Sequence, residues 1–258
     1  MNKLTYKRSL HSGRDDTFMK KILLGLTTTP GSDWREKVKE IDELGIKEIA
    51  LFPTFLKHEE RKILYNLLEK SKIKLIPHVH IRTDMDVEEV IYLKERFGSY
   101  LFNTHANPEW INKILEYKKA NLKIFLENTS LLCLQEIEKH IREVDGLCLD
   151  YSHWKSKKLL REEDYDLLMK RLVDHNKIGC CHISAIYNKP KEMSWSTESP
   201  HYSGHYMYKL SDLDYMKSYV QYLPEIISIE LENSFEEQLK AKEYVEKLIT
   251  MNGQKQPI

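Results

Sequence analysis

The stretch NLKIFLENTSLLCLQEIEKHI, residues 121–141, decides the fold class. Its first part, residues 122–128, is an apolar run with the length of a buried strand. Ser130 then offers an N-cap to a helical pattern that reaches Val144. The strand carries Glu127 at its end, although a carboxylate is costly to bury unless a partner compensates its charge. The stretch therefore predicts a βα unit whose strand presents a carboxylate to such a partner.

The same order recurs along the chain. Further strand-like runs alternate with helical patterns, and they cover residues 21–29, 48–53, 73–81, 99–106, 146–153, 178–186 and 226–233. Buried runs followed by helices of about 10–15 residues indicate parallel βα units. Eight such units in about 250 residues predict an α/β protein with a closed (β/α)8 barrel, or TIM barrel, because open doubly wound sheets have about five to seven strands.

We expect a single barrel domain over residues 21–258, because no linker-like change in composition interrupts the pattern. Residues 1–20 are expected to form a charged arm before the first strand. The longest irregular segment, residues 187–209, follows the seventh strand and is too long for a plain connector. We therefore expect it to fold over the barrel mouth as a lid and to bring His201 or His205 toward the site.

The composition argues against several classes of protein. Lysine plus arginine and aspartate plus glutamate are balanced at 40 each, so no net charge draws the chain to nucleic acid or to anionic membranes. No apolar run approaches the roughly 18 residues of a membrane span, and the N-terminus lacks the apolar core of a secretory signal. The four cysteines show no CxxC spacing, which favours reduced thiols in a cytoplasmic protein. The sequence leaves the oligomeric state open.

In a TIM barrel the active site forms where the strands end. Polar side chains gather at these ends, and they are His78, His80, His105, Glu127, Asp150, His153, His182, Glu230 and Glu232. Side chains alternate along a strand, so those at alternate positions should point together into the barrel mouth. Converging carboxylates resist ionisation unless a positive group lies between them. The interspersed imidazoles therefore indicate a divalent metal, with zinc or manganese well suited to mixed nitrogen and oxygen ligands.

The residues predicted to bind this metal are Glu127, Asp150, His182 and Glu232. Glu230 lies one layer below Glu232, and for this side chain a pairing with Lys123 inside the barrel is the alternative. His80 is predicted to be a hydrogen-bonded scaffold residue, because a single histidine at a strand end more often has that role. The predicted metal would compensate the negative charge of Glu127.

The strand-end motifs resemble those of the xylose isomerase-like TIM-barrel superfamily, which includes endonuclease IV-type AP endonucleases, UV-damage endonucleases and ketose 3-epimerases. The motifs are LEN at 126–128, DYSH at 150–153, HIS at 182–184 and LEN at 231–233, and the resemblance covers about residues 21–250. It implies that Glu127, Asp150, His182 and Glu232 hold a divalent metal. It also implies that His153 binds a further metal, as in the endonucleases, or touches substrate, as in the epimerases.

Other residues match one branch of this superfamily only in part. The resemblance implies that His78 and His105 are further metal ligands, as in the endonucleases. His201 or His205 is nearest to an Asp-x-His pair of the endonucleases, with serine in place of the aspartate. The connections after the second and third strands are short and not basic, unlike the DNA-binding loops of the endonucleases. Lys189 is the nearest substitute for the arginine with which the epimerases hold their substrate.

Two enzymatic functions and one non-enzymatic function follow as hypotheses. The first is a metal-dependent isomerase or epimerase of a sugar or sugar phosphate, in which Glu127 and Glu232 transfer a proton at the α-carbon. Trp154, Trp195 or Tyr206 would close over this carbohydrate-type substrate. The alternative is a zinc-dependent phosphodiesterase of the AP-endonuclease type, the one case in which nucleic acid is a partner. The third is a barrel that binds a metal or a ligand without turnover.

Overall fold

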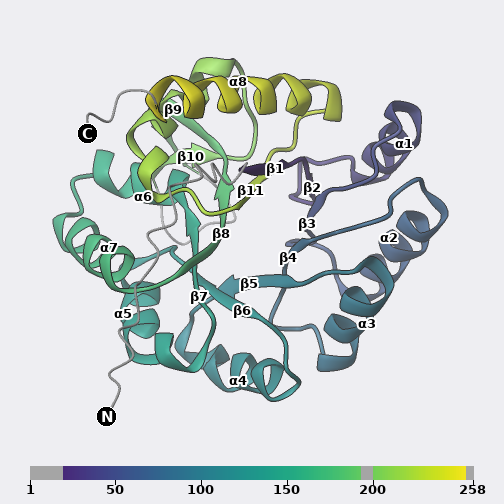
Figure 1. The fold of residues 1–258 in the computed structure, drawn as a ribbon, viewed down its shortest axis with the longest axis horizontal. Helices are drawn as coiled ribbons and strands as arrows, with labels where there is room; N and C mark the ends of the chain where they lie inside the picture. Colours follow the sequence, from purple (N-terminus) through teal and green to yellow (C-terminus); the bar gives the residue numbers. More distant parts are fainter. Residues whose placement is uncertain (1–19, 193–199, 254–258) are drawn as a thin grey trace, which may run out of the picture.

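The computed structural model describes residues 20–192 and 200–253, so the expected N-terminal arm and Trp195 lie outside the described residues. Parallel strands form one nine-stranded sheet that curls into a nearly closed barrel, with the helices around it (Figure 1). The strands are β1 (Lys21–Leu23), β2 (Gly25–Thr27), β3 (Ala50–Phe52), β4 (His78–His80), β5 (Leu101–His105), β6 (Ile124–Glu127), β7 (Gly146–Asp150), β8 (Ile178–Ile183) and β11 (Ile226–Ile229). They follow the order β1-β11-β8-β7-β6-β5-β4-β3-β2 around the barrel. The predicted TIM barrel is confirmed.

The helices are α1 (Trp34–Leu44), α2 (His58–Lys70), α3 (Val87–Phe97), α4 (Ile111–Lys119), α5 (Leu131–His140), α6 (Tyr151–Leu159), α7 (Glu163–His175) and α8 (Phe235–Gly253), with short 3-10 helices η1 (Pro108–Trp110), η2 (Ile141–Glu143), η3 (Leu210–Ser218) and η4 (Val220–Tyr222). Their ends follow local signals: Ser130 caps α5 through its side chain, and Gly45 ends α1 in the left-handed conformation. The charged stretch after β7 forms two helices, because Arg161 adopts a positive φ of 62° between α6 and α7. Within the described part of the chain, no helix has the length and apolar character needed to span a membrane.

The first barrel strand is interrupted between β1 and β2, and the side chain of Gln238 bridges this break, which we call the seam of the barrel. β1 pairs with β11, whereas β2 pairs with β3. At the break, the N–H of Gly25 donates to Oε1 of Gln238 at 2.8 Å, and Nε2 of Gln238 donates to the Gly25 carbonyl at 3.0 Å. A Cβ at Gly25 would stand 1.9 Å from the Ile229 carbonyl oxygen, so only glycine fits there. Gln238 therefore replaces the missing strand-to-strand bonds, and the barrel closes around the site.

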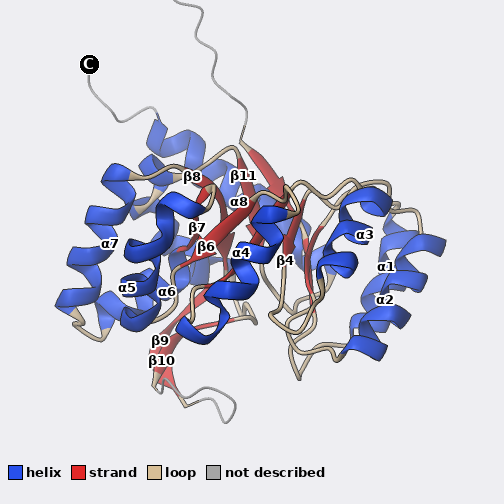
Figure 2. Ribbon diagram, turned by 90° about the horizontal axis from the view of Figure 1, so that it is seen from below, coloured by secondary structure: helices blue, strands red, loops and turns tan. Residues whose placement is uncertain are grey.

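The segment expected to be a lid contains an antiparallel hairpin of β9 (Ala185–Lys191) and β10 (His201–Gly204). Figure 2 shows this hairpin projecting from the barrel beside α6. The Tyr202 N–H donates to Oγ of Ser156 at 2.9 Å and so fixes β10 to α6. The pattern of the sequence did not predict these two strands, because they are short and lie in a polar, turn-rich segment.

Candidate active site

A cavity of about 570 Å³ opens at the carboxyl ends of the barrel strands. Two carboxylates, Glu127 and Glu230, line it together with a ring of imidazoles. These imidazoles belong to His80, His105, His153, His201 and His205. β10 supplies His201 to the wall, and His205 follows directly after this strand, so the hairpin takes the position expected for a lid segment.

Glu127 ends β6 and is buried, and several donors face its carboxylate. Nδ2 of Asn103 donates to Oε2 at 2.6 Å, Nδ1 of His80 is 3.1 Å from Oε2, and Nε2 of His105 is 3.4 Å from Oε1. Burial alone would raise the pKa of Glu127, but the charges of His182, His105 and His80 outweigh it and hold the pKa well below its usual range. Imidazoles and an amide thus compensate the carboxylate at the end of this strand.

Asp150 ends β7 and caps α6 with one of its two oxygens. Oδ1 accepts hydrogen bonds from the Ser152 hydroxyl at 2.6 Å and from the His153 N–H at 2.9 Å. Oδ2 is buried and has no hydrogen-bond partner among the described residues. Nε2 of His153 is 3.6 Å from this oxygen. Asp150 does not itself line the cavity, but its open oxygen lies beside Glu127 and His153, which do line it.

His182 lies on β8 in register with Asp150 on one side and Ser228 on the other. Its ring is fully buried. Nδ1 has no hydrogen-bond partner in the described part of the chain, and it is 3.4 Å from Oε2 of Glu230 and 3.7 Å from Oε2 of Glu127. Burial alone would lower the pKa of His182, but the two carboxylates outweigh burial and raise the pKa to about 10. In the absence of a metal, the ring is therefore a cation whose Nδ1 faces two carboxylates.

Glu230 faces His182 from the strand on its other side. It follows β11 directly and stands two residues beyond Ser228, so alternation directs its side chain into the cavity. Nδ1 of His205 is 3.9 Å from its Oε1. Burial alone would raise the pKa of Glu230, but the charges of His205 and His182 outweigh it and lower the pKa to about 2. The predicted pairing with Lys123 is wrong, because the Lys123 side chain is exposed on the outside.

Glu232, expected to be a metal ligand and a base, does not join this group. Its carboxylate accepts a hydrogen bond from the Thr29 hydroxyl and stands against Gly31. β11 ends at Ile229, so the strict alternation that would have brought Glu232 inside does not continue that far. The structure therefore does not bring Glu232 to the cavity wall, and Glu230 stands there instead.

Three other expected residues lie away from the cavity wall. The Trp154 ring is buried against Tyr219 and Tyr222, and its Nε1 donates to Asp166 at 2.8 Å, because one helical step turns it away from the mouth that His153 faces. Lys189 is exposed on β9 and does not line the cavity. His78 is buried inside the barrel and likewise does not line the cavity.

His80, for which the sequence predicts a scaffold role, lines the cavity beside Glu127. The sequence pattern did indicate this position, because His80 shares the inward face of β4 with His78 and lies nearer the end of the strand. Asn103 was missed as well. It links Glu127 to His78, whose Nε2 is 2.9 Å from Oδ1 of Asn103. An asparagine in the middle of a strand carries no pattern that would single it out.

The donors around the cavity fit a divalent cation. Among the described residues, four groups have ligand atoms within 4.8 Å of one another, and three of them include residues of the cavity wall: His80 with Glu127 and His182, Glu127 with Asp150 and His153, and Asp150 with His182 and Glu230. Asp150 and His182 belong to the same group, and each has a buried atom without a hydrogen-bond partner among the described residues, Oδ2 and Nδ1 respectively. Buried polar atoms without a partner are costly, and a cation would give both atoms one. Mixed imidazole and carboxylate donors suit zinc or manganese.

No protein-family model and no curated protein matches this chain. Solved structures do resemble it. A xylose isomerase-like TIM-barrel protein from Mycobacterium smegmatis, in complex with magnesium, has a TM-score of 0.51 and 13% identity over 90% of this chain and 97% of that chain. A xylose isomerase domain protein from Planctomyces limnophilus has a TM-score of 0.51 and 10% identity over 91% and 97%. An IolI protein with a bound zinc atom has a TM-score of 0.48 and 16% identity over 89% and 99%. On the likeness to the first two of these structures, the chain has the xylose isomerase-like TIM-barrel fold, as its motifs implied.

Proposed function

We propose that this barrel is a divalent-metal-dependent isomerase or epimerase of a small carbohydrate-type substrate. The observation that carries the proposal is the placement of Glu127 and Glu230 on either side of His182, both facing one cavity. Two carboxylates that reach the same bound molecule from different strands can remove a proton from one position and return it at another. Both carboxylates are ionised at neutral pH, because the neighbouring imidazoles lower their pKa values.

The residues proposed to hold the metal are Glu127, Asp150, His182 and Glu230. When bound there, a divalent cation would polarise a substrate carbonyl and help to hold a neighbouring hydroxyl oxygen. Asn103 fixes the orientation of Glu127 through the hydrogen bond to Oε2. His80 and His105 stand beside the same carboxylate and limit where a substrate oxygen can approach it.

The shape and lining of the cavity support a small polar substrate. Its volume of about 570 Å³ falls in the range of about 300–1,000 Å³ that is typical of small-molecule sites. Hydroxyl groups line it beside the imidazoles, from Thr54, Thr83, Thr104, Thr129, Ser130, Ser152, Ser184 and Ser203. Phe55 and Trp110 add apolar surface, on which the carbon face of a sugar ring can pack. Hydroxyl-rich substrates pair well with such a wall, since each substrate hydroxyl both donates and accepts.

A second candidate is a metal-dependent phosphodiesterase, and one observation favours it. Glu127 belongs to two donor groups, one with His80 and His182 and the other with Asp150 and His153. Donor groups that share a carboxylate can hold two cations, and paired metals stabilise the attacking and the leaving oxygen in phosphoryl transfer. The serine that replaces the aspartate of the endonuclease pair counts against this candidate.

Metal stoichiometry and isotope exchange separate the two candidates. The protein is purified without chelator, its metal content per chain is measured, and it is incubated in heavy water with a panel of ketoses and their phosphates. An isomerase places solvent deuterium on the α-carbon of the product, because the carboxylate that accepts the proton exchanges it. Two or three metals per chain, cleavage of an abasic-site oligonucleotide and no deuterium uptake would reverse the ranking.

A further inference from the structure

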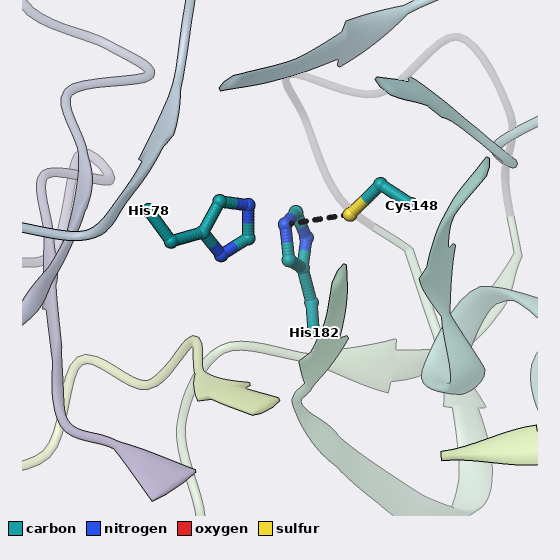
Figure 3. A group of neighbouring side chains, drawn as sticks. All are labelled: His78, Cys148 and His182. Carbon is teal, nitrogen blue, oxygen red and sulfur yellow. Dashed lines mark hydrogen bonds between the residues drawn. The ribbon is translucent and has the colours of Figure 1, made fainter. Parts of the chain in front are cut away.

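A thiol lies directly beneath the candidate metal site. Cys148 precedes Asp150 by two residues on β7, and Cys180 and His182 stand level with them on β8. Figure 3 shows the imidazole of His182 between His78 and Cys148, with a hydrogen bond to the thiol. The Cys148, His78 and His182 side chains are all fully buried. Because the three side chains are buried, bonds to water cannot replace the hydrogen bonds that they make with one another.

The two nitrogens of His182 face different groups. Nδ1 faces the carboxylates of Glu127 and Glu230, whereas Nε2 is 3.3 Å from Sγ of Cys148. A neutral imidazole carries one proton, and a nitrogen that binds a metal must be free of it. If Nδ1 is the ligand atom, the proton must be on Nε2 and needs an acceptor. Among the described residues, the hydrogen-bond partner of Nε2 is Cys148.

We propose that Cys148 is a positioning residue for the metal site: its sulfur accepts a hydrogen bond from Nε2 of His182 and holds the ring with Nδ1 bare and directed at Glu127 and Glu230. This inference rests on the proposed metal site. A histidine that binds a metal almost always donates its other N–H to a fixed acceptor, which sets the tautomer and the ring orientation. Here a thiol takes the place that a carboxylate or a carbonyl has in most proteins.

The same three side chains could be considered a second metal site, since their ligand atoms lie within 4.8 Å of one another. The contacts of His78 argue against it. Its Nδ1 is 2.7 Å from Oγ of Ser228 and its Nε2 is 2.9 Å from Oδ1 of Asn103. Both nitrogens already have partners, so binding a metal would cost one of these buried hydrogen bonds. The arrangement fits an acceptor for His182 better than it fits a separate cation.

The first test measures zinc affinity by calorimetric titration of the metal-free protein, with a competing chelator and at one pH. Cys148→Ala should weaken zinc binding about 10- to 100-fold, which is typical when the partner of a ligating histidine is lost. Cys148→Ser should recover most of this loss, because a hydroxyl oxygen can also accept the N–H. The matched control is Cys181→Ala. Cys181 is equally buried on β8, but its sulfur faces the Ile226 carbonyl, so this variant should bind zinc like the wild type.

A second measurement uses the unaltered protein, so it stands even if Cys148→Ala does not fold. Imidazole nitrogen signals of the zinc-loaded, ¹⁵N-histidine-labelled protein are recorded, and His182 is assigned by its absence in His182→Asn. The proposal expects a protonated Nε2 and a metal-bound Nδ1. Cys148→Ala that binds zinc as tightly as Cys181→Ala, or a His182 bound to zinc through Nε2, would overturn it. A wild-type protein that binds no metal is a different outcome, and it would overturn the proposed function as well.

Discussion

Asn128 is joined to Asp150 by two hydrogen bonds that copy the pairing between neighbouring strands. The Asp150 N–H donates to Oδ1 of Asn128 at 2.8 Å, and Nδ2 of Asn128 donates to the Asp150 carbonyl at 2.9 Å. Asn233, which ends the second LEN motif, holds the backbone of Met207 in the same way at 2.7 and 2.9 Å. Each asparagine thus extends the hydrogen bonding of the backbone beyond its own strand. The asparagine of the repeated motif therefore has the same structural role in both copies. The glutamate lines the cavity in the first copy, as Glu127, but not in the second, as Glu232.

Asn128→Ala should therefore weaken metal binding without removing a ligand. The loss frees the end of β7, so Asp150 no longer presents Oδ2 in a fixed position, and buried backbone groups lose their partners at about 1–3 kcal/mol each. Asn233→Ala loses the matching pair of bonds at Met207 and should cost similar stability, but it should leave zinc affinity close to that of the wild type. Urea unfolding and zinc titration of both variants test this. Equal losses of zinc affinity in the two variants would contradict it.

The seam of the barrel gives a prediction about stability. Gln238 bonds to the N–H and carbonyl of Gly25 and to the carbonyls of Leu231 and Asn233. Gln238→Ala leaves several buried backbone groups without partners, so the free energy of unfolding should fall by about 3 kcal/mol or more. Gln221→Ala is the control, because the Gln221 amide bonds to an exposed carbonyl and should cost less than about 0.5 kcal/mol. Similar urea midpoints for both variants would show that the seam does not depend on this side chain.

The charge on His182 makes the stability of the metal-free protein depend on pH. Burial would lower its pKa, but Glu127 and Glu230 raise it to about 10 from an ordinary value of 6.5. The folded state then holds a proton that the unfolded chain releases at lower pH. The stabilisation is complete below about pH 6.5 and is lost as pH rises toward 10. Urea unfolding in chelator should show this decline, and His182→Gln should show a shallower one. A wild-type profile as flat as that of His182→Gln would contradict the assignment.

The sequence was sufficient for the barrel because most strands are buried apolar runs and several helices begin at a capping residue, such as Asp33, Asp86 or Ser130. It was also sufficient to bring Glu127, Asp150 and His182 to one end of the barrel. It failed where side-chain direction depends on the point at which the regular strand ends. β11 ends at Ile229, and no feature of the run to Asn233 marks that point. It also assigned Trp154 to the mouth, although a single helical step separates that ring from His153.

The two glutamates after β11 provide a matched pair for the last prediction. Oε2 of Glu230 is 3.4 Å from Nδ1 of His182, whereas the Glu232 carboxylate bonds to Thr29 away from the cavity. Glu230→Gln keeps an oxygen that can face the metal, but it removes a negative charge and a group that can accept a proton. Zinc affinity should fall about 10-fold or more, because a neutral amide oxygen replaces a charged ligand.

Deuterium uptake by a ketose substrate should be abolished in Glu230→Gln, since the amide cannot take the proton from the α-carbon. Glu232→Gln changes the same atoms two residues away and should keep both zinc affinity and exchange, with a stability loss of about 1–2 kcal/mol from the weakened bond to Thr29. Zinc calorimetry and exchange in heavy water, with unfolding curves for both variants, distinguish a local role from a loss of folding. If Glu232→Gln lost metal binding and exchange while Glu230→Gln kept them, the placement of the two side chains relative to the cavity would have to be reversed.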